Sequence, residues 1–281
     1  MFGRRQTPAK TDEQILLMRR AGLLVGQTLE LLQGEASAGM TTLDLDTLAE
    51  DFIRAHGGIP NFQLEAGYSH TLCTSVNEEI VHGIPGARVL KDGDLLSIDC
   101  GAEVDGWNGD AAVSLVVGGR EAASEADLRL LGTTEDSLWA GMAALRVGDR
   151  LYAVGEAVEA SIIASGERHG HDYGIVEEYV GHGIGRSMHE DPQIPNYGVR
   201  DHGPVVRSGF TGAIEPMATW GSPGTRVLAD DWTVVTRDGS PAAHWEHTVA
   251  VTNAGLWVLT AVDGGQRRLE AAGAAYAPLA G

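Results

Sequence analysis

The sequence predicts an α+β fold in which helices cover an antiparallel sheet core of pseudo-twofold design. Helical spacing of apolar residues occurs in two separate regions, 11–57 and 122–165, and β-favouring segments follow each region. The order of helix, helix and strands therefore occurs twice, without a residue-level repeat. Because 43% of the 281 residues are hydrophobic, we expect one large domain over 11–262, flanked by flexible tails at 1–10 and 263–281.

Two helices are expected before the first strands. Thr11 and Gln14 have the spacing of a capping box and precede apolar residues that recur with helical spacing. A second amphipathic stretch begins after Thr41 or Thr42, either of which is a suitable N-cap residue, and Gly57 stops it. Both helices are expected to pack an apolar face onto the sheet.

A hairpin is predicted over residues 94–118, with its turn at 104–106. Asp99 and Asp110 lie on its two arms, where alternation of side chains can bring both carboxylates onto one face. We expect the Asn108-Gly109 pair to form a bulge that adjusts this register. The hairpin would then present two acidic groups to a common site.

The second half of the chain repeats the pattern. Helical spacing extends from Ala122 to Leu145, and a turn and another helical run to Ser165 follow. Strands then carry three more polar residues inside apolar or glycine-rich segments, namely His182, Glu215 and Glu246. The site is expected between the two halves of the fold.

Five residues from both halves form one chemical set: Asp99, Asp110, His182, Glu215 and Glu246. A carboxylate inside a folded domain is strongly destabilising unless it is paired, hydrogen-bonded or bound to a metal ion. Four carboxylates and one imidazole in buried strands therefore predict a site for two divalent cations. One aspartate alone could instead be an edge-strand charge that prevents aggregation.

Composition restricts the classes of partner. The net charge of −19 and the pI near 4.8 argue against DNA and membrane surfaces as ligands, because phosphates would be repelled. Only Cys73 and Cys100 are present, and we find no signal segment or long apolar span, so a cytoplasmic location is expected. A monomer is the expected oligomeric state. The basic residues Arg4, Arg5 and Lys10 permit a contact with ribosomal RNA.

Two motifs give these residues a named resemblance. One is Asn77-Glu78-Glu79-Ile80-Val81-His82-Gly83-Ile84-Pro85, and the other is Gly181-His182-Gly183-Ile184-Gly185-Arg186-Ser187-Met188-His189-Glu190. With the five residues above, in that order, the chain resembles type I methionine aminopeptidases from about Thr11 to about Val258. The resemblance implies the pita-bread fold. It also implies removal of the initiator methionine from nascent proteins when the next residue is small.

The resemblance also implies roles for individual residues. Asp99 would bind one metal ion, Asp110 and Glu246 would bridge both ions, and His182 and Glu215 would complete the other site. The ions would activate a water molecule, and the sequence does not distinguish among Co, Mn, Fe and Zn. Glu215 would also carry a proton. His189 would lie near the scissile carbonyl and His82 near the amide nitrogen, both with catalytic roles.

Substrate selection requires an apolar pocket of a size that suits a thioether side chain. Position relative to the motifs indicates five candidates, although core packing is a serious alternative: Phe62, Tyr68, Cys73, Met188 and Trp232. Met188 stands where an aromatic residue is expected, so strict methionine selectivity is open. Gly101 and the Ala111-Ala112 pair lack hydroxyl groups near the metals, which would leave outer contacts missing or supplied by water.

Three alternatives share parts of this pattern. An Xaa-Pro-cleaving aminopeptidase has similar ligands but usually a large extra amino-terminal domain, whereas only 98 residues precede Asp99. A type II methionine aminopeptidase would carry a helical insertion between Glu215 and Glu246, which are 31 positions apart. A non-catalytic protein that binds nascent chains or ribosomes would be favoured by loss of ligands, and all five ligands are present.

Overall fold

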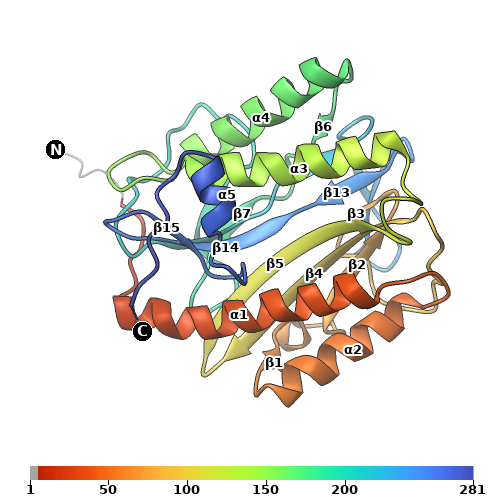
Figure 1. Cartoon of the computed structure of the whole chain (residues 1–281), viewed down its shortest axis with the longest axis horizontal. Helices are drawn as coiled ribbons and strands as arrows, with labels where there is room; N and C mark the ends of the chain where they lie inside the picture. The colour runs from red at the N-terminus through yellow and green to blue at the C-terminus, as the bar shows by residue number, and fades with distance from the viewer. Residues whose placement is uncertain (1–5, 281) are drawn as a thin grey trace.

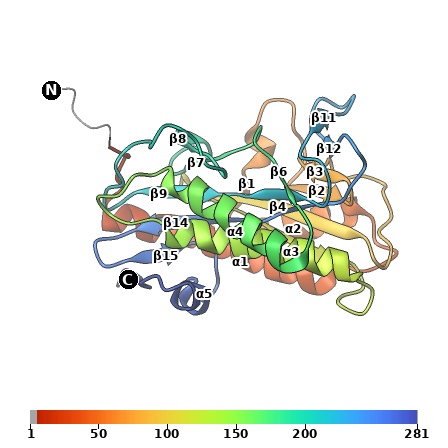
Figure 2. The same cartoon turned by 90° about the horizontal axis from the view of Figure 1, so that it is seen from above.

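A nine-stranded antiparallel sheet forms the centre of the molecule, and the four long helices lie on one side of it (Figures 1 and 2). The structure is a computed structural model that describes residues 6–280. The sheet has the order β1-β4-β5-β14-β9-β7-β8, with β2 paired to β4 and β15 paired to β14. Its strands are β1 (Ile59–Pro60), β2 (Leu72–Val76), β4 (Leu95–Val104), β5 (Trp107–Val116), β7 (Gly181–Gly183), β8 (Glu190–Ile194), β9 (Thr211–Ile214), β14 (Glu246–Val251) and β15 (Leu256–Val258).

The first two helices begin where the sequence predicts. α1 (Asp12–Glu35) follows Thr11, and α2 (Thr42–Ala55) follows Thr41; each has a complete capping box. The buried face of α1 packs on β4 and β5. A Cβ atom on Gly109 of β5 would lie only 2.7 Å from the backbone of Gly22 in α1, so two glycines permit this close approach.

The predicted hairpin is formed by β4 and β5. Its turn has positive φ angles at Asp105 (53°) and Gly106 (75°), as expected for a two-residue hairpin loop. The register continues without interruption past Asn108 and Gly109, so the predicted bulge is wrong. Gly109 instead permits close packing against α1, and the Asn108 side-chain amide donates to the Gly185 carbonyl at 3.1 Å.

The second helical pair is α3 (Glu125–Ala143) and α4 (Ala153–His169), which pack against each other above the sheet in Figure 1. α4 continues beyond Ser165, the predicted end, because Gly170 supplies the left-handed C-cap. Two three-stranded sheets complete the fold, and one of them packs against α3. One sheet consists of β6 (Gly174–Ile175), β10 (Met217–Thr219) and β13 (Ala242–His244). The other consists of β3 (Glu79–Val81), β11 (Thr225–Val227) and β12 (Val234–Thr236). A 3-10 turn, η1 (Phe62–Leu64), precedes β2.

The chain near its two ends differs from the expected flexible tails. After residue 262 the structure has α5 (Gln266–Ala271), whose Leu269 is fully buried in the core. Near the start, the Thr7 amide donates to the Val205 carbonyl at 3.0 Å, and Thr7 is only 1% exposed. Both segments are thus packed on the domain. Among residues 6–280, none of the helices is long and apolar enough to cross a membrane.

Candidate metal centre

The register of the hairpin brings Asp99 and Asp110 onto one face. Asp99 lies opposite Ala112, and Asp110 lies opposite Gly101, so the two aspartates are diagonal neighbours across the strand pair. Diagonal residues of an antiparallel pair point to the same side of the sheet. Both side chains are buried, with Asp99 9% and Asp110 4% exposed. The hairpin therefore carries two carboxylates into the interior, as the sequence predicts.

Strand β14 brings the third carboxylate beside the hairpin. Glu246 is its first residue and pairs with Ala112 of β5. Two residues later the Thr248 hydroxyl donates to the Asp110 carbonyl at 2.8 Å and accepts its amide N–H at 3.1 Å. A side chain thus satisfies both backbone groups of Asp110 where the ladder to β5 has ended. Asp110 and Glu246 are consequently fixed relative to each other.

His182 approaches from β7, and its tautomer follows from its hydrogen bond. The Nδ1 atom lies 2.9 Å from the Gly183 carbonyl, which can only accept, so Nδ1 carries the proton. The Nε2 lone pair then faces the carboxylates of Glu215 at 3.6 Å and Asp110 at 3.9 Å. Burial lowers the pKa of His182 to about 4, so the ring is neutral. A lone pair facing two carboxylates is unfavourable unless a cation or a proton lies between them.

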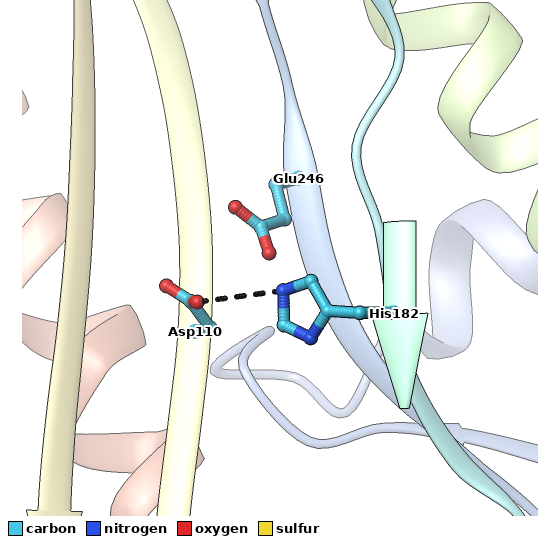
Figure 3. Close-up of side chains that lie close together, drawn as sticks. All are labelled: Asp110, His182 and Glu246. Carbon is cyan, nitrogen blue, oxygen red and sulfur yellow. Dashed lines mark ion pairs between the residues drawn. The ribbon is translucent and has the colours of Figure 1, made fainter. Parts of the chain in front are cut away.

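Asp110, His182 and Glu246 form the most compact group (Figure 3). One ligand atom from each lies within 4.8 Å of the others. Three carboxylate oxygens of the site are buried without a hydrogen-bond partner: Asp99 Oδ1, Asp110 Oδ1 and Glu246 Oε1. Orphaned buried acceptors are costly, and hard oxygen atoms with one imidazole nitrogen are ligands that suit divalent ions. The donor set therefore fits a metal centre.

Without a metal ion, the same carboxyl groups tend to retain their protons. Burial raises the pKa of Asp99 to about 7. Burial also raises the pKa values of Asp110, Glu215 and Glu246 well above the usual range, and the negative charge of neighbouring carboxylates adds to the effect. A bound divalent cation would oppose both causes, because it neutralises the repulsion and replaces the lost solvation.

All twelve residues that the sequence proposes for the site line one cavity of about 170 Å³. Five of them make an apolar wall that is separate from the main cores, and we call this wall the apolar pocket: Phe62, Tyr68, Cys73, Met188 and Trp232. Its rings are in contact, with the Tyr68 and Trp232 centroids 4.9 Å apart. The pocket thus lies beside the carboxylates and does not belong to the general core.

The remaining predicted residues, His82 and His189, also line this cavity. The His189 ring is 4.4 Å from the His182 ring, measured between centroids. His82 has a φ of 59° and packs edge-on against Tyr179 at 5.6 Å. Burial lowers the pKa of His82 to about 4 and also lowers the pKa of His189. Both histidines are therefore neutral near pH 7 and can donate through one ring nitrogen.

Sequence reasoning missed three neighbours of the site. Glu65 lines the cavity, and its charge acts to raise the pKa of His189. Asn61 occupies the space beside Gly101, where an added Cβ atom would lie 2.1 Å from its Oδ1, so water does not fill that place. His244 is 1% exposed, and its unpartnered Nε2 lies 3.9 Å from Glu246 Oε2. His244 lies two residues before Glu246, so strand alternation places the two side chains on one face.

The loop before His189 is held by Glu190. Its carboxylate accepts N–H groups from Arg186 at 2.8 Å and Ser187 at 3.2 Å, and it forms an ion pair with Lys10 at 2.7 Å. Lys10 is thus paired within the fold, and its proposed contact with the ribosome stays a prediction. Arg4 and Arg5, proposed for the same contact, lie outside the described residues.

Comparison with known proteins agrees with this geometry. The model of metallopeptidase family M24 matches residues 16–253. "Methionine aminopeptidase 1" of Mycobacterium tuberculosis is 49% identical over 259 residues, which are 92% of this chain and 96% of that protein. The crystal structure of a methionine aminopeptidase from Thermotoga maritima has a TM-score of 0.85 and 38% identity, and the match covers 91% of this chain and 100% of that one.

A prolidase from Pyrococcus horikoshii shares the fold more distantly. Its TM-score is 0.69 at 18% identity, and the match covers 90% of this chain but 63% of the prolidase. The likeness to the methionine aminopeptidases therefore extends over whole chains, whereas the likeness to the prolidase extends over a part of it. Together with the family match, these findings establish that the chain belongs to metallopeptidase family M24 and groups there with the type I methionine aminopeptidases.

Proposed function

We propose that this chain is a metal-dependent aminopeptidase that removes the initiator methionine from nascent proteins when the next residue is small. One observation carries the proposal: an apolar pocket adjoins a buried set of unpartnered carboxylate oxygens and a neutral imidazole in a single cavity. The pocket would take the methionine side chain, while the carboxylates would hold the ions. Relatives named methionine aminopeptidase support this choice over the Xaa-Pro-cleaving alternative.

We infer two ions, held by Asp99, Asp110, His182, Glu215 and Glu246. When bound, divalent ions at this place would lower the pKa of a water molecule and polarise the scissile carbonyl. The four carboxylates supply a charge of −4 against +4 from two dications, so the site balances two ions better than one. Their identity among Co, Mn, Fe and Zn would depend on supply as well as on ligand type.

The chain's own groups would move the proton and hold the substrate. Glu215, with its raised pKa, would accept a proton from the attacking water and deliver it to the leaving amine. His189 would donate a hydrogen bond to the developing oxyanion. His82 would form a hydrogen bond at the nitrogen of the amide bond that is cut. These histidines also line a second cavity of about 500 Å³, through which the rest of the peptide would leave.

Peptide hydrolysis tests the proposal directly. Purified protein, treated with chelator and then given Mn²⁺ or Co²⁺, should cleave Met-Ala-Ser and should cleave Met-Phe-Ser and an Xaa-Pro peptide much more slowly. His182→Ala should abolish activity and lower the bound metal, while the exposed His202→Ala serves as the matched control. Faster cleavage of the Xaa-Pro peptide, or activity that survives the chelator, would reject the proposal.

A further inference from the structure

A buried aspartate outside the cavity has no part in the proposed reaction. Asp46 lies in α2, is 5% exposed and does not line the catalytic cavity. Aspartate is a poor residue for a helix interior, and a buried carboxylate is costly unless its oxygens are satisfied. Burial raises the pKa of Asp46, while hydrogen bonds from its neighbours act to lower it. Its partners must therefore account for its presence.

Those partners all belong to the segment that leads into β2. Asp46 Oδ1 accepts the amide N–H groups of Thr71 and Leu72, each at 2.8 Å. Its Oδ2 lies 3.2 Å from Nδ1 of His70. One carboxylate on a helix thus fixes three consecutive residues of a neighbouring segment, and bonds to a charged acceptor are stronger than bonds between neutral groups.

The same segment carries two walls of the apolar pocket. Tyr68 precedes it, and the Tyr68 hydroxyl donates to the Leu72 carbonyl at 2.7 Å. Cys73 follows it and lies opposite Asp99 in the β2–β4 register. Asp46 therefore holds the amide of Leu72, and the carbonyl of the same residue holds the Tyr68 side chain. Rigid placement of pocket walls by surrounding hydrogen bonds is how a site achieves selectivity.

We propose that Asp46 is a positioning residue for substrate selectivity, which anchors Tyr68 and Cys73 to α2 and so fixes the shape of the apolar pocket. This inference rests on the proposed aminopeptidase function. Asp46 itself lies outside the cavity that contains the proposed metal ligands. Loss of the anchor would loosen the pocket without altering the carboxylates, so binding of the methionine side chain should weaken while the metal content remains unchanged.

The test compares Asp46→Ala with Asp44→Ala. Asp44 lies on the same helix, and its carboxylate caps that helix by accepting the Thr41 amide at 2.7 Å, without any contact to residues 68–73. Asp44→Ala should therefore destabilise α2 in a comparable way, by loss of a cap. For wild type and both variants, KM and kcat are measured with Met-Ala-Ser and Leu-Ala-Ser, together with bound metal and the melting temperature.

We expect Asp46→Ala to raise KM for Met-Ala-Ser about tenfold with little change in kcat, and to lower the preference for methionine over leucine several-fold. Asp44→Ala should lower only the melting temperature. If Asp46→Ala does not fold, Asp46→Asn decides, because it retains an acceptor oxygen without the charge; its KM should rise about threefold. Unchanged KM and preference in the deciding variant would overturn the inference, whereas failure of wild type to cleave Met-Ala-Ser would instead overturn the proposed function.

Discussion

Replacement of Asp99 by Asn should stabilise the metal-free protein, although it removes a proposed metal ligand. Asp99 has a pKa of about 7 in the folded chain, against an ordinary value of 3.8. Because its pKa is higher in the folded chain than in the unfolded chain, the protonated Asp99 favours folding. This contribution to the free energy of unfolding is complete below pH 3.8 and is lost as the pH rises to about 7. The metal-free wild type should therefore become less stable across this window, and Asp99→Asn should not show this loss.

The magnitude follows from the gap between the two values. Each pH unit inside the window costs about 1.4 kcal/mol, so the full loss from Asp99 is about 4 kcal/mol. Because solubility falls near the pI of about 4.8, the usable range is roughly pH 5.5 to 7.5. Over that range we expect the free energy of unfolding of wild type to fall by about 2 kcal/mol relative to Asp99→Asn.

Urea unfolding of chelated protein at both pH values measures the difference. Glu103→Gln is the matched control, because it removes an equal charge from the partly exposed end of the same strand. With Mn²⁺ at about 100 times its dissociation constant, wild type should gain about 2.7 kcal/mol by mass action, and Asp99→Asn should gain less. The advantage of Asp99→Asn over wild type should thus shrink when the metal replaces the chelator.

The reasoning would be refuted by metal-free wild type that is equally stable at the two ends of that pH range. It would also be refuted by a Glu103→Gln variant that gains as much stability as Asp99→Asn, since net charge and not burial would then be the cause. Equal stabilisation of wild type and Asp99→Asn by Mn²⁺ would show that Asp99 does not hold the ion.

Three further predictions concern the surroundings of the centre. His82→Ala and His189→Ala should each lower kcat about 100-fold without loss of bound metal. The peptide assay measures kcat, and metal analysis of the same samples measures the bound metal. A parallel loss of kcat and bound metal would contradict the roles proposed for the two histidines. Gly101→Ser should lower the free energy of unfolding by about 1–3 kcal/mol, because its Cβ would lie 2.1 Å from Oδ1 of the buried Asn61. Urea unfolding measures the loss, and Gly34→Ser is the control because Gly34 lies in open space. Lys10→Met should lower kcat/KM about three- to tenfold, because the loop that ends at His189 loses its ion-pair anchor, and an unchanged kcat/KM would exclude that coupling.

The sequence by itself determined the local features of this protein. The capping box of α1, the N-cap of α2 and the hairpin could be predicted from short patterns, because caps and tight turns depend on residues within a few positions of one another. The proposed ligand set, from Asp99 to Glu246, could be predicted because several acidic groups buried together in apolar strands are rarely stable without a cation. The family resemblance then supplied the apolar pocket, whose proposed members line one cavity in the structure.

Only the tertiary structure decided which distant groups meet. The close approach of Gly22 and Gly109, the filling of the space at Gly101 and the anchoring of the pocket by Asp46 join residues that are remote in the chain. The ion pair of Lys10 with Glu190 spans 180 positions, and the sequence gives no indication of this structural role. Such contacts depend on packing between elements, and local periodicity contains no information about them.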